Sequence, residues 1–149
     1  MANALEFRSV TKTYPGSPPV TAVNGVSISF PEGSFSAIIG PSGSGKSSFL
    51  NLASGLDRPT EGEIEIGGKK ISLLSRTELA RFRARNVGFV FQAYNLFPAL
   101  TALENVEFTL RIRGDGRADS RKRAVSALES VGLGNKLSSM PAKLSGGQQ

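Results

Sequence analysis

The most constraining feature of this sequence is a glycine-rich stretch, residues 40–47, that reads Gly-Pro-Ser-Gly-Ser-Gly-Lys-Ser. It fits the pattern Gly-x-x-x-x-Gly-Lys-Ser/Thr at every fixed position. An apolar segment, residues 34–39, precedes it, and residues 46–53 follow it with apolar side chains at helical spacing. The pattern therefore predicts a strand, a tight loop and a helix in that order, as in an α/β fold.

The residue types in this phosphate loop, as we call residues 40–47, suit the binding of phosphate groups. Glycines let backbone N–H groups turn toward phosphate oxygens, and the N-terminus of the following helix attracts anions. Lys46 can reach the β- and γ-phosphates of a nucleotide, and the Ser47 hydroxyl can bind Mg²⁺. The alternative is a chance match in a chain with 17 glycines. The candidate phosphate-binding residues are Gly40, Pro41, Ser42, Gly43, Ser44, Gly45, Lys46, Ser47 and Ser48.

The composition excludes several other classes of function. The 149 residues contain no cysteine and no histidine, so disulfides, thiolate or imidazole metal sites and histidine-dependent triads are ruled out. No apolar run approaches the roughly 18 residues that span a bilayer, and the N-terminus has no signal-peptide pattern. Hydrophobic residues make up 39% and charged residues 20%, which is enough for a packed core. We therefore expect a soluble, cytoplasmic chain.

The net charge of +6 is concentrated in the middle of the chain. Residues 76–123, the basic stretch, hold ten arginine or lysine side chains against five acidic ones, whereas the rest has eight against seven. Such a stretch can meet nucleic acid, anionic lipid or an acidic partner. The simpler interpretation is the solvated surface of helices.

Strand signals dominate the first half of the chain, and helix signals dominate the second. Two capping boxes, Ser75 with Glu78 and Thr101 with Glu104, predict helices that run to about residues 85 and 113. Another helix is expected over residues 119–131. The expected strands cover residues 5–13, 20–23, 26–30, 34–39, 63–66 and 87–91.

Three further motifs resemble those of the ATP-binding-cassette (ABC) ATPases. Residues 144–149, Leu-Ser-Gly-Gly-Gln-Gln, are similar to the signature motif of that family, and residues 87–92 resemble the strand that leads to its Q-loop. Tyr14 lies where the family places an aromatic that stacks on adenine. Together with the phosphate loop, these motifs occur in the order of the family, from about residue 5 to residue 149.

The resemblance implies an α/β P-loop ATPase fold of the ABC type, as one partial nucleotide-binding domain over residues 1–149. Its β-rich part and P-loop core would cover about residues 1–92, and its Q-loop and helical subdomain about residues 93–149. Residues 55–62 and 91–106 look most like one bacterial branch of the family. That branch includes the lipoprotein-releasing, macrolide-exporting and cell-division ATPases.

The resemblance also implies a role for each matching residue, with ATP and Mg²⁺ as ligands. Tyr14 would stack on the base with Val20 or Val23 beside it, and Gln92 would contact Mg²⁺ or the attacking water. Ser145 and Gly147 would cover the γ-phosphate held by a second copy. Simpler alternatives remain: a surface aromatic for Tyr14, a strand-edge cap for Gln92 and a linker for the signature motif.

The partners that the resemblance implies are a transmembrane permease subunit and a second ATPase domain in a head-to-tail homodimer. The chain would then lie on the inner face of the plasma membrane, with no nucleic acid bound. Phe97, Pro98 and Leu100 are candidates for the contact with the permease, unless they only pack in the core. The alternatives are a soluble ABC ATPase that acts on nucleic acid or ribosomes, and a non-catalytic nucleotide-binding fragment.

The Walker B aspartate, the catalytic glutamate and the switch histidine follow the signature motif in this family, and this sequence does not contain them. We therefore expect a fragment of a longer ATPase, with Lys46 and Gln92 as its catalytic residues and negligible hydrolysis by the fragment alone. Without the strand that carries the Walker B aspartate, residues 34–39 would have an unpaired apolar edge.

Overall fold

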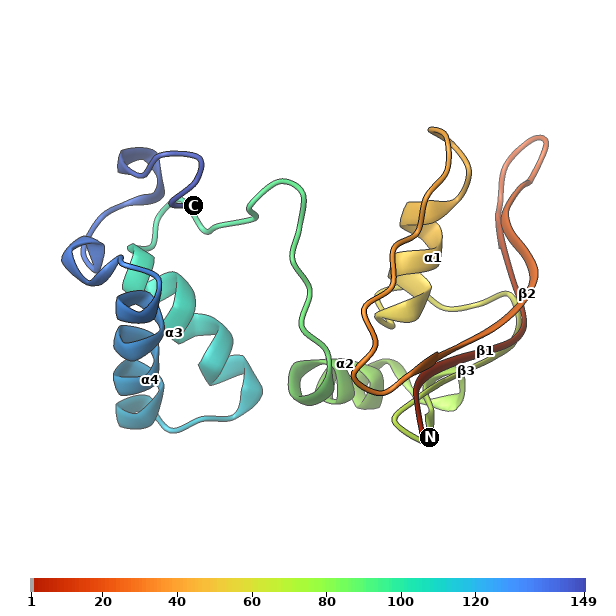
Figure 1. Ribbon diagram of the computed structural model, residues 1–149, viewed down its shortest axis with the longest axis horizontal. Helices are drawn as coiled ribbons and strands as arrows, with labels where there is room; N and C mark the ends of the chain where they lie inside the picture. The colour runs from red at the N-terminus through yellow and green to blue at the C-terminus, as the bar shows by residue number, and fades with distance from the viewer. Residues whose placement is uncertain (1) are drawn as a thin grey trace. The chain divides into compact units, whose positions relative to one another are not determined.

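A four-stranded antiparallel sheet with the strand order β2-β1-β3-β4 organises the first part of the fold (Figure 1). The computed structural model describes residues 2–149, which divide into two units between Val87 and Gly88. The strands of the first unit are β1 (Asn3–Tyr14), β2 (Val20–Pro31), β3 (Glu61–Ile66) and β4 (Lys69–Lys70).

One face of this sheet carries the core of the first unit and the helix α1 (Lys46–Ala53). Phe7 and Val10 of β1 are almost fully buried, as is Leu52 of α1. The rings of Phe7 and Phe49 stack with their centroids 4.5 Å apart. Burial of each such side chain stabilises the fold by about 1.5–3 kcal/mol, so these contacts hold α1 against the sheet.

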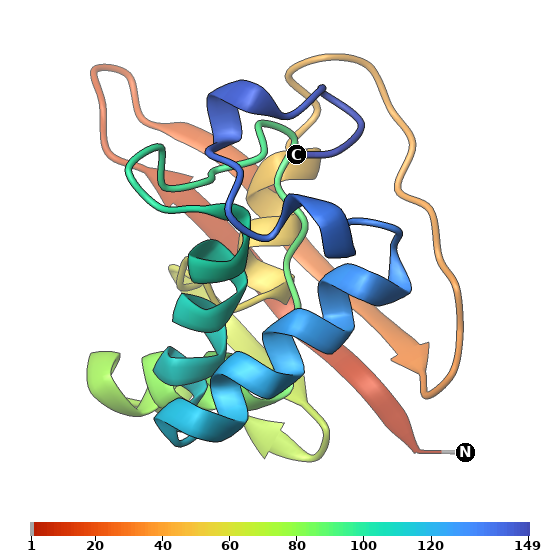
Figure 2. The ribbon, with the colours of Figure 1, turned by 90° about the vertical axis from the view of Figure 1, so that its left-hand side faces the viewer.

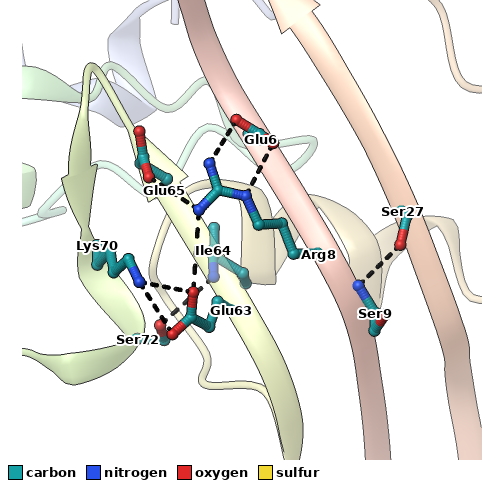
Figure 3. Close-up of polar contacts among 9 residues, drawn as sticks. All are labelled: Glu6, Arg8, Ser9, Ser27, Glu63, Ile64, Glu65, Lys70 and Ser72. Atoms are coloured by element: carbon teal, nitrogen blue, oxygen red, sulfur yellow. Dashed lines mark hydrogen bonds and ion pairs between the residues drawn. The ribbon is translucent and has the colours of Figure 1, made fainter.

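The opposite face of β1 and β3 is polar (Figure 3). Arg8 Nε donates a hydrogen bond of 2.9 Å to Glu6, and the same guanidinium lies 3.4 Å from Glu65 and 3.9 Å from Glu63. Lys70 lies 2.9 Å from Glu63. Neighbouring side chains on a strand point to opposite faces, so one face of the sheet is charged and the other is apolar. The helix α1 covers only the apolar face.

β2 is a single strand, whereas two short strands, residues 20–23 and 26–30, were expected. The pairing with β1 shifts register between Val10 and Lys12, opposite residues 24 and 25. Gly25 has φ of +58° and donates its N–H to Thr11 Oγ1. The Asn-Gly pair therefore makes a bulge that the strand passes through, and the predicted interruption is wrong.

The segment after β3 leads to the helix that was expected from the capping box of Ser75 and Glu78. A two-glycine turn joins β3 to β4, and a 3₁₀ turn, η1 (Ile71–Leu73), leads to helix α2 (Arg76–Asn86). Ser75 and Glu78 form the expected capping box at the start of α2. Leu79 is buried in the same core as Phe7, so α2 packs against the core of the unit to which it belongs.

The second unit is helical. Helices α3 (Ala102–Arg113) and α4 (Arg117–Ser130) lie side by side in Figures 1 and 2, and two 3₁₀ turns follow, η2 (Gly134–Lys136) and η3 (Pro141–Lys143). The capping box of Thr101 and Glu104 starts α3 as predicted. A separate core holds the unit together, made of Ala102, Leu103, Ala124, Leu128 and Leu144.

Two expected strands are absent from the described residues, and these predictions are wrong. Residues 34–39 run as an extended loop between β2 and α1 (Figure 2), and residues 87–91 also have no regular structure. Phe35, Ile39 and Val90 are 98%, 93% and 96% exposed. A strand needs a neighbour to pair with its backbone, and within residues 2–149 neither segment has one. No helix in this range is both long and apolar enough to cross a membrane.

Candidate functional site

The phosphate loop ends at a close approach between α1 and β2. Gly45 is the N-cap of α1 and has φ of +84°, in the left-handed region that favours glycine. A Cβ atom at this position would lie 2.1 Å from the carbonyl oxygen of Ala22 in β2. The last glycine of the pattern is therefore needed for packing as well as for the turn.

The N-terminus of α1 is free to bind an anion. α2 and α3 begin with capping boxes, but α1 has no side-chain cap and no acidic residue in its first turn. The first N–H groups of a helix have no partner within the helix, and the helix dipole adds positive potential at this end. A phosphate group is the chemical partner that satisfies both features.

Lys46 closes the phosphate loop and keeps donor capacity for a ligand. Its Nζ atom donates to the carbonyl oxygens of Gly40 and Pro41 at 2.9 and 2.6 Å, and lies 3.4 Å from Ser44 Oγ. An ammonium group has three N–H donors, so the long contact with Ser44 can give way to a phosphate oxygen. Ser47, exposed at the start of α1, offers the hard oxygen ligand that Mg²⁺ prefers.

A cavity of about 460 Å³ lies between the phosphate loop and β2. Its walls include Lys46, Ser44 and Phe49 on one side and Val23 on the other. Val23, expected beside the base, is mostly buried in the core, while Val20 is exposed on β2. The volume falls in the usual range for small-molecule sites, so the loop faces a usable pocket.

Tyr14 is half-buried at the end of β1 and is tied to α1 and to the segment that follows it. Its hydroxyl donates to Asp57 Oδ2 at 2.9 Å, and Ser48 Oγ lies 3.4 Å from the same phenol oxygen. Lys12 Nζ sits 4.9 Å from the centre of the Tyr14 ring and 2.7 Å from Asp57 Oδ1. The structure thus brings Tyr14 together with the helix of the phosphate loop.

Asp57 and Lys12 are the residues of this site that sequence reasoning missed. Partial burial raises the pKa of Asp57, but hydrogen bonds from Lys12, the Arg58 N–H and Tyr14 outweigh it, and the pKa lies below its usual value. Lys12 stands two residues before Tyr14 on one strand, and that spacing is a signal for a shared face. Nothing local in the sequence points to Asp57.

The other predicted site residues belong to the second unit. Gln92 is exposed in an irregular segment. The signature motif is anchored by Leu144, which is buried in the helical core, and it then turns outward. Ser145 and Gly147 are exposed in this turn, which is closed by the Gln148 N–H to the Ser145 carbonyl at 2.9 Å.

A second cavity, of about 480 Å³, lies on the surface of α3 and α4, and Leu100 and Phe108 form part of its wall. The rings of Phe97 and Phe108 meet edge to face at 4.8 Å, and both remain largely exposed. Asn105 is buried beneath the preceding segment, where it accepts the Phe97 N–H at 2.8 Å and donates to the Leu100 carbonyl at 3.0 Å.

The family profile described as "ABC transporter" matches residues 23–149. An uncharacterized ABC transporter ATP-binding protein of Thermotoga maritima is 47% identical over the whole chain, which covers 64% of that protein. The lipoprotein-releasing system ATP-binding protein LolD of Alcanivorax borkumensis is 43% identical over 97% of the chain and 64% of its own length.

Larger proteins and solved structures match as well. The macrolide export ATP-binding/permease protein MacB of Marinobacter nauticus is 44% identical over 97% of this chain and 23% of its own length. The dimeric structure of MJ0796, a bacterial ABC transporter cassette, has a TM-score of 0.87 at 44% identity, over 97% of this chain and 64% of that one. The chain thus spans about 64% of several relatives that it matches.

Proposed function

Because the chain belongs to the ABC transporter family, we propose that it binds ATP with Mg²⁺ at residues 40–47 and serves as the ATP-binding part of a transporter. The solved cassettes confirm the ABC-type fold expected from the sequence. The observation that carries the proposal is the uncapped N-terminus of α1 beside Lys46, whose ammonium group keeps a donor for a phosphate oxygen.

Each candidate site residue of the first unit has a defined part in this proposal. The N–H groups that open α1 and the Lys46 ammonium hold the phosphates, while the Ser47 hydroxyl binds Mg²⁺, which would neutralise phosphate charge when bound. Tyr14 stacks on the base. Val20 and Val23 contribute apolar surface on β2, and Val23 also lines the cavity next to the phosphate loop.

The second unit supplies the remaining proposed site residues. We assign Gln92 to the Mg²⁺ or the attacking water, and Ser145 and Gly147 to the nucleotide of a second copy in a head-to-tail dimer. The exposure of Ser145 and Gly147 above the buried Leu144 supports this assignment. The solved MJ0796 cassette, dimeric by its description and bound to ADP and phosphate in one structure, supports it as well.

Coupling to a membrane protein is part of the same proposal. The names of the relatives, which include an ATP-binding/permease protein and a lipoprotein-releasing ATP-binding protein, support a permease partner. We propose that the chain meets this partner at the inner face of the plasma membrane. Phe97, Pro98 and Leu100 are the contact that we propose, since Phe97 is exposed and Leu100 lines a surface cavity. ATP hydrolysis then drives this partner.

Calorimetric titration of ATP-Mg²⁺ into the 149-residue chain and into a Lys46→Ala variant tests nucleotide binding. A charged hydrogen bond is worth about 1.5–3 kcal/mol, so the variant should bind about 10- to 150-fold more weakly. Lys122→Ala, which removes the same charge from an exposed position in α4, is the matched control and should bind as the parent does. Equal affinity of the Lys46→Ala variant and the parent would contradict the proposal.

A further inference from the structure

We propose that Asp57, acting with Lys12, is a positioning residue that holds the Tyr14 ring in place for an adenine base. This inference rests on the proposed function, because it assumes that a nucleotide binds next to the phosphate loop. It adds a support for the base-binding ring, built from β1 and the segment after α1, to the loop that binds the phosphates.

The carboxylate of Asp57 is already engaged through both oxygens by groups of the chain itself. Oδ1 accepts from Lys12 Nζ at 2.7 Å and from the Arg58 N–H at 2.7 Å, and Oδ2 accepts from the Tyr14 hydroxyl at 2.9 Å. The Lys12 charge also neutralises a carboxylate that would otherwise repel phosphates. The group therefore acts through Tyr14 rather than on the nucleotide itself.

The Lys12–Asp57 pair is sheltered enough to fix a geometry. The side chains of Lys12 and Asp57 are 14% and 29% exposed, and Lys12 Nζ also donates to the Arg58 carbonyl at 2.9 Å. Coulombic attraction is stronger in such a setting than between fully solvated side chains. Three hydrogen bonds, two from Lys12 and one from Tyr14, thus join β1 to the segment after α1 at this point.

This network leaves the aromatic ring of Tyr14 with a single face for a base. The hydroxyl is anchored to Asp57, so the ring cannot swing about its χ angles, and Lys12 sits over one face at 4.9 Å. A base can stack only on the other face. Because the ring is ordered before the nucleotide arrives, binding does not pay for its immobilisation.

The test compares ATP-Mg²⁺ with inorganic tripolyphosphate, which has the phosphates but no base. The variants are Tyr14→Phe, which keeps the ring and loses its anchor, and Asp57→Ala; Asp57→Asn keeps an acceptor and should restore part of the effect. We expect Tyr14→Phe and Asp57→Ala to weaken ATP binding about 2- to 10-fold and to leave tripolyphosphate affinity unchanged. Far-UV circular dichroism establishes that each variant is folded.

Fluorescence gives an independent readout, since the chain has two tyrosines and no tryptophan. In a Tyr94→Phe background, the emission comes from Tyr14 alone. ATP should quench this emission through contact with the base, whereas tripolyphosphate should not. Asp57→Ala should reduce the quenching at saturating ATP, because a mobile ring spends less time in the stacked geometry.

The outcomes separate this inference from the proposed function. Equal losses of ATP and tripolyphosphate affinity in the Asp57 and Tyr14 variants would mean that the network shapes the phosphate loop, and would overturn the inference. Unchanged ATP affinity in all three variants would overturn it as well, while the parent's ATP binding would still support the proposed function. A parent chain that binds neither ligand would overturn both.

Discussion

Replacement of Gly45 by alanine tests whether the contact between α1 and β2 sets the geometry of the phosphate loop. The added Cβ would lie 2.1 Å from the Ala22 carbonyl oxygen, and contacts below 3.0 Å are essentially never seen. Both groups belong to the backbone, so no change of rotamer relieves the contact. The start of α1 and β2 must therefore separate by at least 0.9 Å, the difference between these two distances.

Two costs follow from this displacement. An alanine in the left-handed region costs roughly 1–2 kcal/mol by itself. In addition, a shift of this size stretches an N–H to phosphate hydrogen bond from about 2.9 Å to nearly 4 Å, beyond the range of a hydrogen bond. The loss of one such charged bond, about 1.5–3 kcal/mol, weakens ATP binding about 10- to 150-fold.

The assays are urea unfolding and ATP-Mg²⁺ titration of the parent and two variants. Gly68→Ala is the matched control, because Gly68 has φ of +77° in the β3–β4 turn and open space around the added Cβ. The free energy of unfolding of this variant should fall only by the cost of an alanine in the left-handed region, and its ATP affinity should not change. Gly45→Ala should be less stable than Gly68→Ala and should bind ATP more weakly. If both variants unfold at the same urea concentration and bind ATP equally, the argument from the close contact is refuted.

Three further predictions follow from individual contacts. Ser75→Ala removes the side-chain cap of α2 and should lower the free energy of unfolding by about 1 kcal/mol, measured by urea titration. Because the pKa of Asp57 is lowered by folding, its charge contributes stability that is fully present above its unfolded pKa of about 3.9 and lost below it. The stability difference between the parent and Asp57→Asn should therefore be constant near pH 7 and shrink below about pH 4, as followed by unfolding at each pH. Asn105→Ala should cost about 1–3 kcal/mol and speed hydrogen exchange of the Phe97 amide, which loses its acceptor.

The helices were predicted well because their signals are local. Capping boxes place the starts of α2 and α3 within four residues of sequence, and the structure has both. The bounds expected for α1 also agree with the structure, since apolar spacing and the preceding glycines are read from adjacent residues. Strands β1 and β3 were found from short apolar alternation and the glycine turn.

The errors concern properties that depend on distant parts of the chain. Residues 34–39 have the composition of a strand, but hydrogen bonding to a neighbour decides whether a strand forms. The pairing of Lys12 with Asp57 spans 45 positions, and no pattern within either segment announces it. The chemistry of the phosphate loop was readable from residue types, whereas the support behind Tyr14 required the tertiary structure.

The order of the strands in the sheet has a consequence for the way in which the chain folds. β1 lies between β2 and β3, but β2 follows it after a short connection, whereas β3 begins at Glu61, thirty positions after β2 ends at Pro31. Closing a loop of this length costs about 3 kcal/mol of chain entropy, so the β1–β2 hairpin should form first. The phosphate loop lies inside the later closure. Pulsed hydrogen–deuterium exchange during refolding measures when each amide becomes protected. The amides of β2 should become protected early, and those of β3 and α1 should follow together.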